Sequence, residues 1–389
     1  MALSFIGDIL SRKIMLPSVI LLIVLGIIFG PVLGPVLGLD RTSLVGVVPF
    51  LAPLTLVFIA FNAGAHMNIQ EVMEQSQRAL VMSVLGFLLS TIIVGIFLHF
   101  AFSIRWAYSL LLSSAWGGVN TATIVAIGKH LRISGKAITT LTVSSLIDDA
   151  IVLISALTIL SYITVGGTGF DDISLTLVRN ICVSLFLGAI IGVAWLNILY
   201  LSRRGEYTFT FTLAALLLLY SLTEMLGGTG AIAVFLFGLI LGNSTSLCRS
   251  LGLEVDVDEL SRMKDSMMKF HSELTFIVVT FFFTFIGLIY VFTGVFDVVL
   301  GLIISLLLHG TRYVAVRLGT WRSSLASDLP TIGLIVGKGA ASAAMSTLPL
   351  AYGLPNTAMF SSIALNVILF TNIISIILPI LVSRHRKKA

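Results

Sequence analysis

The sequence predicts an all-α polytopic membrane protein with about twelve transmembrane helices. Three observations lead to this fold class. The 389-residue chain is 57% hydrophobic and only 11% charged, whereas a soluble domain carries about 25% charged residues. Its mean hydropathy is +1.09. The apolar residues also fall into runs of roughly 20 residues, the length that a helix needs to cross the hydrocarbon core of a bilayer.

Twelve apolar runs account for most of the chain. Their approximate ranges are 14–36, 48–68, 78–102, 105–129, 137–163, 175–201, 206–225, 228–243, 272–293, 295–319, 330–352 and 356–383. Residues 1–12 are expected to form a short helix at the membrane surface or a shortened preceding span. The segment 244–271 is expected to be an amphipathic connector that lies on the membrane surface.

The basic residues support this count and give an orientation. Of the 23 Lys and Arg residues, 18 fall in the terminal segments and even-numbered loops, and only Arg41, Arg105 and Arg179 fall on the other side. Basic residues collect in cytoplasmic loops, so both termini are expected to be cytoplasmic in a cell membrane, inner or plasma. The positive charges do not cluster with aromatic residues, which argues against nucleic acid as a partner.

Asp148 and Asp149 are the only acidic residues near the middle of a span, about eleven residues into 137–163. Charge inside hydrocarbon is costly, so such residues mark ion pathways by default. Successive helix residues point about 100° apart, so the two carboxylates face different neighbours. A buried carboxylate that holds either H⁺ or Na⁺ is itself an exchange site. The alternative is a buried ion pair that only locks two helices together.

Hydroxyl groups accompany the acids. Ser144 and Ser145 lie four residues before Asp148 and Asp149, so each serine shares a helix face with one acid. Oxygen ligands suit a hard cation, which makes the serines candidate supporting ligands. The alternative is that they bond to their own helix backbone.

Arg312 and Lys338 are the only basic residues that lie more than four residues from either end of a span. Each is expected to neutralise an acid or a helix C-terminus, and the alternative is that each extends to the interface. His309 shares a helix face with Arg312, where packing is favoured over a role as a proton relay.

Two spans are interrupted by small residues. In 105–129 the pair Gly117–Gly118 precedes Asn120 and Thr121, and in 330–352 two glycines flank Lys338. Helices open at membrane depth only where the backbone is buried in protein or lines a cavity. The two spans are seven apart and therefore run in opposite directions, which predicts an inverted-repeat transporter with a midplane site. The alternative is tight helix packing through small residues.

These segments resemble the monovalent cation:proton antiporter superfamily, which includes the sodium/proton antiporters. Its paired-acid helix is similar to SSLIDDAIVLI, and its two crossing helices are similar to NTATIVAIGKHL and GKGAASAAM. Its opening helix, small-residue helix and Phe-rich helix are similar to LPSVILLIVLGIIFGP, GTGAIAVFLFGLILGN and FFFTFIGL. The resemblance covers nearly the whole chain.

The resemblance implies an inverted-repeat antiporter fold with two crossed discontinuous helices. It implies a secondary active transporter, not an enzyme, that exchanges Na⁺, Li⁺ or K⁺ for H⁺ by alternating access without a cofactor. It implies that Asp149 is the exchanging carboxylate and Na⁺ ligand, and that Asp148 is an auxiliary acid, which is Asn in the electroneutral branch. The other positions that match the family are Asn120 and Thr121 in the unwound segment, and Arg312 and Lys338 as basic partners.

The resemblance further implies one membrane domain over residues 1–389, with a core bundle around 78–163 and 295–383. The remaining helices are expected to form a scaffold and a homodimer interface within the lipid bilayer. The chain departs from the family at Ala122 and Ala340, where some members carry acids. Two adjacent acids point to the electrogenic branch and Arg312 to the electroneutral one, so the stoichiometry stays open.

Three other functions are open to the sequence. A sodium-coupled symporter of an organic solute could share a related fold, and a non-transporting sensor could retain it. An intramembrane aspartyl protease is disfavoured, because its two aspartates come from different helices.

Overall fold

The computed structural model describes residues 18–38, 44, 46–120, 123–124, 127, 131, 133–165, 170–201, 208–250, 257–290, 292, 294–354 and 357–386. The expected surface helix at 1–12 and the candidate ligand Thr121 lie outside these ranges. The described elements are α2 (Ser18–Ile27), η1 (Ile28–Val32), α3 (Gly34–Leu37), α5 (Val48–His66), α6 (Ile69–Phe102), α7 (Trp106–Ala115), α9 (Gly135–Val165), α10 (Phe170–Leu201), α11 (Thr208–Met225), α12 (Gly230–Gly242), α13 (Ser244–Ser250), α14 (Val257–Leu288), α15 (Val295–Gly319), η2 (Ser324–Ser327), α16 (Leu329–Ile332), α17 (Ala340–Ala351) and α18 (Thr357–Arg386).

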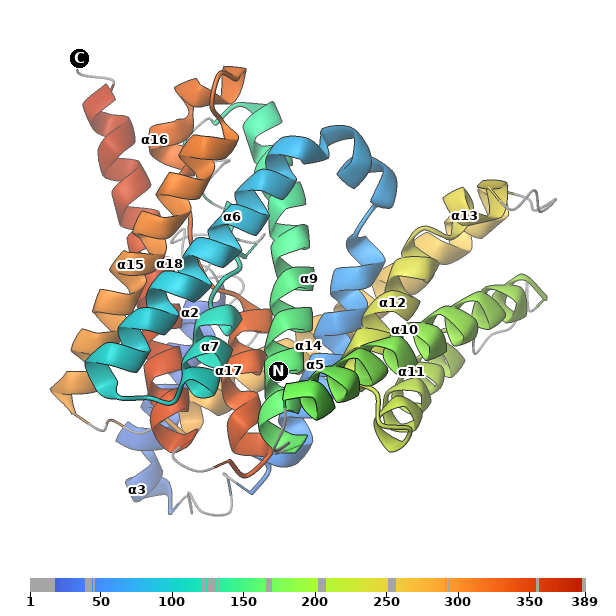
Figure 1. Ribbon diagram of the computed structural model, residues 1–389, viewed down its shortest axis with the longest axis horizontal. Coiled ribbons are helices and arrows are strands. Elements are labelled where there is room, and N and C mark those ends of the chain that lie inside the picture. The colour runs from blue at the N-terminus through green and yellow to red at the C-terminus, as the bar shows by residue number, and fades with distance from the viewer. Residues whose placement is uncertain are drawn as a thin grey trace. The chain divides into compact units, whose positions relative to one another are not determined.

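All regular structure in the described ranges is helical, as the composition predicts (Figure 1). Each of the twelve predicted spans coincides with a helix or with a helix and its interruption. Six described helices are long and apolar enough to cross a membrane, and five shorter apolar helices of 10–17 residues accompany them. A helix satisfies its own backbone hydrogen bonds, which is what hydrocarbon requires of a spanning segment.

The segment 244–271 differs from the prediction. Residues 257–271 are the first turns of α14, one continuous helix that runs on through the expected span to Leu288. Arg262, Asp265 and Lys269 are exposed and follow one another at spacings of three and four residues, a pattern that is compatible with a helix that continues into an apolar span. Within the described part of the expected connector, only α13 is separate from α14.

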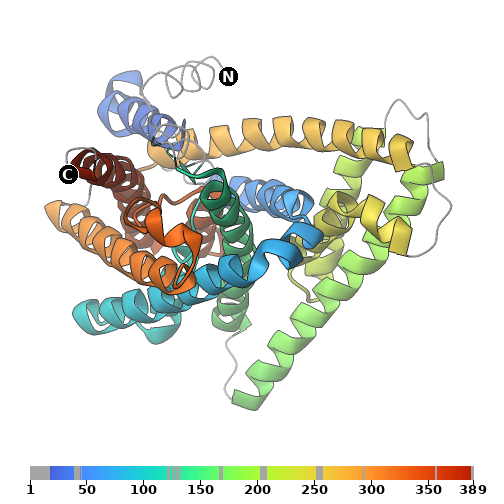
Figure 2. The ribbon, with the colours of Figure 1, turned by 90° about the horizontal axis from the view of Figure 1, so that it is seen from above.

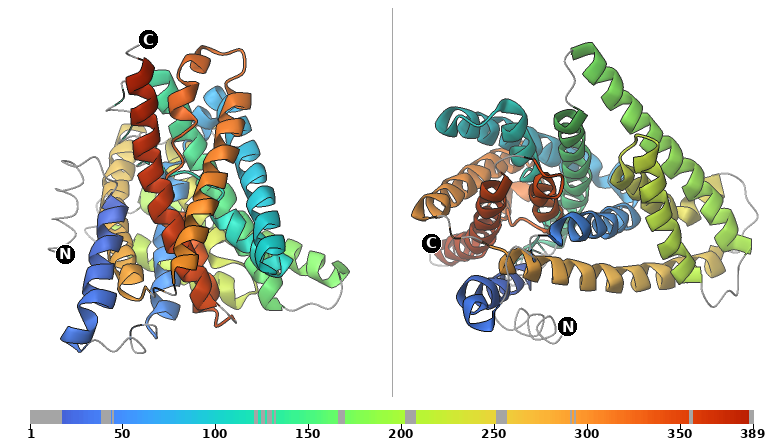
Figure 3. Two further views of the ribbon diagram at one scale, coloured as in Figure 1. Left: turned by 90° about the vertical axis from the view of Figure 1, so that its left-hand side faces the viewer. Right: turned by 90° about the horizontal axis from the view of Figure 1, so that it is seen from below.

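The chain divides into two compact units. The first comprises Met1–Pro53, Met73–Ala156 and Val279–Ala389. In this unit α15 and α17 both pack against α18, and α7 packs against α17 (Figures 1 and 3). Helix α16 contacts α18 as well. Helix α18 therefore lies beside both α16 and α17, the two helices on either side of an interruption.

The second unit comprises Leu54–Val72 and Leu157–Val278. Here α12 packs against α10 and α11 (Figure 2). A Cβ added at Gly238 or Gly242 of α12 would collide with the backbone of α5. Such small residues let two backbones approach closely, which stabilises helix pairs in a bilayer through dispersion contacts.

Candidate functional site

The first interruption follows α7. The helix ends at Ala115, and Gly118–Asn120 carry no helical structure. Glycine weakens a helix by about 1 kcal/mol relative to alanine, so the Gly117–Gly118 pair allows the chain to leave the helix there. Trp116 anchors the end of α7, because its indole Nε1 donates to Ser346 Oγ of α17 at 2.9 Å.

The second interruption separates α16 from α17, and Ile335–Gly339 lack helical structure. The two interruptions meet: the Asn120 N–H donates to the Gly337 carbonyl at 2.8 Å. A Cβ at Gly337 would lie 2.5 Å from Asn372 Oδ1 and 2.6 Å from Thr123 Oγ1. Only glycine fits this close approach, and the predicted pair of discontinuous helices is therefore present and in contact.

Asn372 of α18 holds both interruptions. Its Nδ2 donates to the Lys338 carbonyl at 2.9 Å, and its Oδ1 accepts from Thr123 Oγ1 at 3.1 Å. The first of these bonds satisfies a carbonyl that an intact helix would have bonded internally. Asn372 is not among the site residues predicted from the sequence. An amide in the middle of an apolar span was the available signal, because polar residues at that depth are retained for a reason.

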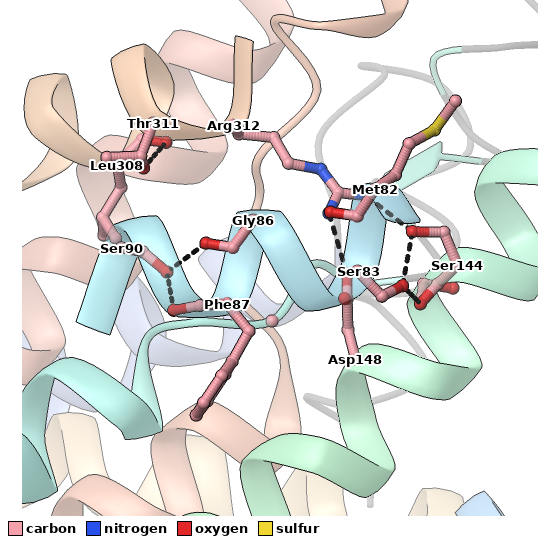
Figure 4. A network of polar contacts seen from close by, with 12 residues as sticks. Met82, Ser83, Gly86, Phe87, Ser90, Ser144, Asp148, Leu308, Thr311 and Arg312 are labelled. Carbon is pink, nitrogen blue, oxygen red and sulfur yellow. Dashed lines mark hydrogen bonds and ion pairs between the residues drawn. The ribbon is translucent and has the colours of Figure 1, made fainter. Parts of the chain in front are cut away.

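Asp148 is fully buried and forms an ion pair. Its Oδ2 lies 3.3 Å from Arg312 Nη1 (Figure 4). Arg312 is 3% exposed, so neither charge is screened by water. A Cβ on Gly118 would lie 3.4 Å from Asp148 Cβ, which places this ion pair directly beside the first interruption. Between the two basic candidates, Arg312 is the one that pairs with Asp148.

Ser144 belongs to the same network. Arg312 Nη2 donates to Ser144 Oγ at 2.9 Å, and Arg312 Nη1 donates to the Met82 carbonyl at 3.2 Å. Ser83 of α6 donates to the Ser144 carbonyl at 2.8 Å and also lies 2.9 Å from its Oγ (Figure 4). Ser144 therefore fixes the guanidinium that faces Asp148.

Asp149 has different surroundings from its neighbour. It is partly exposed, and within the described residues it has no hydrogen bond or ion pair. Ser145, its predicted companion, donates to the carbonyl of Thr142 in its own helix at 2.8 Å. Such a bond to the backbone of its own helix is the alternative to a role as an ion ligand. Ser144 and Ser145 thus do not behave as an equivalent pair.

Lys338 is 1% exposed, and its Nζ donates to the Gly118 carbonyl at 2.5 Å. The ammonium group thereby satisfies a carbonyl beyond the C-terminal end of α7, where a positive charge is favoured. It ties the second interruption to the first. Neither Lys338 nor Arg312 extends to the interface, because both side chains are buried.

The same arrangement of helices occurs in a solved structure. The sodium proton antiporter MjNhaP1 from Methanocaldococcus jannaschii matches with a TM-score of 0.79 at 19% sequence identity, over 100% of this chain and 96% of that chain. A likeness at this identity shows the fold. The family described as sodium/hydrogen exchanger, transmembrane, matches residues 1–384. The chain belongs to the sodium/hydrogen exchanger family.

Curated relatives of the exchanger family carry two cation specificities in their names. The K(+)/H(+) antiporter NhaP2 of Shewanella sp. (strain ANA-3) is 22% identical over 328 residues, which cover 81% of this chain and 54% of that protein. The low-affinity Na(+)/H(+) antiporter NhaS1 of Synechocystis sp. is 28% identical over 200 residues, which cover 50% and 36%. The chain thus spans about half the length of the curated relatives it matches.

Membership in the exchanger family decides between some of the alternatives. The protein is a multi-pass membrane protein of a transporter family, so the intramembrane protease alternative is rejected. The recognised superfamily and the fold with two interrupted, contacting helices are both confirmed.

Proposed function

We propose that the protein exchanges a monovalent cation, Na⁺ or K⁺, for H⁺ across a membrane, and that Asp149 is the carboxylate for which the two ions compete. The observation that carries this proposal is the contrast between the two acids. Asp148 is occupied by Arg312, whereas Asp149 is partly exposed and has no partner among the described residues. One carboxylate is therefore free to take either ion. The names of the relatives supply Na⁺ and K⁺ as candidates, and Li⁺ is a third.

The exchange follows from the cost of burying charge. An ionised carboxylate without a partner is strongly disfavoured away from water, so Asp149 crosses only when it holds a proton or a cation. In the proposed alternating-access cycle, Asp149 releases H⁺ on one side, binds the cation, and is carried to the other side. The carrier is the bundle around 78–163 and 295–383, and the other helices act as the scaffold. Asn120 and Thr121 are proposed to supply further oxygen ligands.

The ion pair suggests the stoichiometry. If Asp148 stays paired with Arg312 through the cycle, a single carboxylate exchanges one H⁺ for one cation, and no net charge moves. We therefore propose electroneutral exchange, although two adjacent acids alone suggest a second proton. The symport alternative finds no support in the family match.

We also propose that both termini are cytoplasmic and that the protein is a homodimer. The distribution of basic residues supports the orientation, and attachment of a membrane-impermeant reagent to a cysteine introduced near either terminus would test it. Crosslinking in native membranes would test the dimer.

The experiment is a transport assay in liposomes. The purified protein is reconstituted with an internal pH-sensitive dye, and Na⁺, Li⁺ or K⁺ is added outside at several pH values between about 6 and 9. Protein-free liposomes provide the background. Proton movement above background with at least one cation supports exchange, and that cation is the substrate. Silence with all three cations would remove the proposal, and a sodium-dependent uptake screen would then test symport.

A further inference from the structure

His309 of α15 lies outside the network of Asp148 and Arg312 but is connected to the second interruption. It is 4% exposed. Its Nδ1 lies 2.7 Å from the Ser305 carbonyl of its own helix, and its Nε2 lies 3.3 Å from Ser375 Oγ of α18. Ser375 Oγ in turn accepts from the Val336 N–H at 2.8 Å. The chain of contacts thus ends on the unwound backbone, two residues before Lys338.

For a neutral imidazole, the direction of each hydrogen bond in this chain follows from the groups that it joins. A carbonyl oxygen only accepts, so Nδ1 of His309 carries a hydrogen and donates to Ser305. A backbone N–H only donates, so Ser375 Oγ accepts from Val336. With Nδ1 protonated, Nε2 of a neutral ring is an acceptor, and the hydroxyl hydrogen of Ser375 can donate to it. All polar atoms of the two side chains are satisfied at once.

Ser375 is unusual among the buried hydroxyl groups. Many hydroxyls of this protein donate to a carbonyl three or four residues earlier in their own helix, and Thr371, one turn before Ser375, donates to the Val367 carbonyl at 2.7 Å. In the described part of the chain Ser375 makes no such bond. Because this local bond is the default for a serine in a membrane helix, something must hold the hydroxyl away from it, and His309 Nε2 is the group in contact.

We infer that His309 is a positioning residue of the transport site, which acts through Ser375 to fix the unwound backbone at Val336. Asn372 binds the neighbouring Lys338 carbonyl from the same face of α18. Two side chains of α18 therefore bond the interrupted backbone: Ser375 accepts from the Val336 N–H, and Asn372 donates to the Lys338 carbonyl. This inference deepens the proposed exchange at the same site, and its transport readout rests on that function.

Two substitutions of His309 separate positioning from packing. In His309→Asn the amide can still donate to the Ser305 carbonyl but cannot reach Ser375. In His309→Gln the longer amide places an acceptor near the position of Nε2. We expect His309→Asn and Ser375→Ala to raise the apparent KM for the driving cation about fivefold to tenfold, with the maximal rate within about twofold, because a loosened site binds less well while the exchanging carboxylate is intact. His309→Gln is expected to restore most of the affinity.

Two further variants sharpen the assay. Thr371→Val removes a hydroxyl that bonds only within its own helix, and its KM is expected to stay within about twofold of wild type. The double variant His309→Asn/Ser375→Ala is expected to show the same loss as either single variant, because residues that act through one another are not additive. Additive losses would show that the two residues act separately and would overturn the inference.

Hydrogen exchange tests the inference without transport. Peptides that contain Val336 are followed by mass spectrometry, since amide exchange reports local opening. His309→Asn and Ser375→Ala should speed exchange at this amide about tenfold or more, whereas His309→Gln and Thr371→Val should not. If wild type fails to transport any cation while this pattern holds, the proposed function fails and the positioning role stands. Unchanged exchange in both disruptive variants, or equal behaviour of the Asn and Gln variants, would overturn the positioning role.

Discussion

Two adjacent residues of α9 carry the same carboxylate and have opposite surroundings. On one side of the helix, Asp148 is fully buried against Arg312, whose guanidinium is also bonded to Ser144. On the other side, Asp149 is partly exposed and has no partner among the described residues. The rotation of about 100° between neighbouring residues of a helix is enough to separate them. The comparison shows that two adjacent acids in a membrane helix need not have the same surroundings.

The largest loss of stability is expected when the ion pair between Asp148 and Arg312 is broken. In Arg312→Gln, Asp148 becomes a buried charge without a partner, and the apparent free energy of unfolding in detergent should fall by about 3–5 kcal/mol. The matched control is Arg317→Gln, an exposed position of the same helix, which should change stability by less than about 0.5 kcal/mol.

The double variant Arg312→Gln/Asp148→Asn sharpens this test. It replaces two charges by two neutral amides of similar size, and it should recover most of the lost stability because no unpaired charge remains buried. Equal stability of the single and double variants would show that Arg312 does not compensate Asp148.

The amide that joins the two interruptions is expected to matter next. Asn372→Leu leaves the Lys338 carbonyl and the Thr123 hydroxyl without their bonds, and unsatisfied buried groups cost about 1–3 kcal/mol each. Asn197→Leu is the control, because Asn197 is exposed and its Nδ2 bonds to the Val193 carbonyl of its own helix. Denaturant or thermal unfolding of both variants measures the difference, and equal losses would contradict the role given to Asn372.

A smaller effect is expected from the hydroxyl beside the guanidinium. Ser144→Ala removes a hydrogen bond to a charged group, which should cost about 1.5 kcal/mol. Ser155→Ala on the same helix removes a bond to the Ile151 carbonyl of that helix and should cost less than about 0.5 kcal/mol. Thermal unfolding distinguishes the two, and a reversed order would place Ser144 outside the network.

The smallest effect is expected from voltage. If one carboxylate exchanges one H⁺ for one cation, no net charge crosses the membrane, and an imposed membrane potential should change the initial rate by less than about twofold. Each elementary charge that did cross would instead contribute about 2.3 kcal/mol per 100 mV. A potassium-selective ionophore sets the potential in liposomes driven by Na⁺. A strong dependence of the rate on potential would mean that Asp148 also gives up a proton.

The sequence predicts the spans and the two interruptions because hydropathy and small residues are local signals. Gly118 and Gly337 weaken their helices whatever lies around them. The partner of Asp148 could not be predicted, because both Arg312 and Lys338 lie at suitable depth and the choice depends on helix rotation. The continuity of α14 was also missed, since a charged stretch before an apolar span fits both a loop and a helix.

Other parts of the site depend on contacts between distant segments. Asn372 and Ser375 lie near the end of the chain, and their partners follow α7 and α16. A polar residue inside an apolar span indicates that something is bonded there, but it does not indicate what. Packing is favoured for His309 over a proton relay, and its contact with Ser375 could not be predicted because that residue lies on another helix.

The proposed difference in role between Asp148 and Asp149 is tested most directly by substituting each acid in turn. Asp149→Asn, Asp148→Asn and the double variant Arg312→Gln/Asp148→Asn are reconstituted at equal protein content, and cation-driven proton movement is measured beside wild type. The account predicts that Asp149→Asn falls to the level of protein-free liposomes, while at least one of the two Asp148 variants still exchanges. Exchange by Asp149→Asn, or its loss in both Asp148 variants despite normal folding, would contradict it.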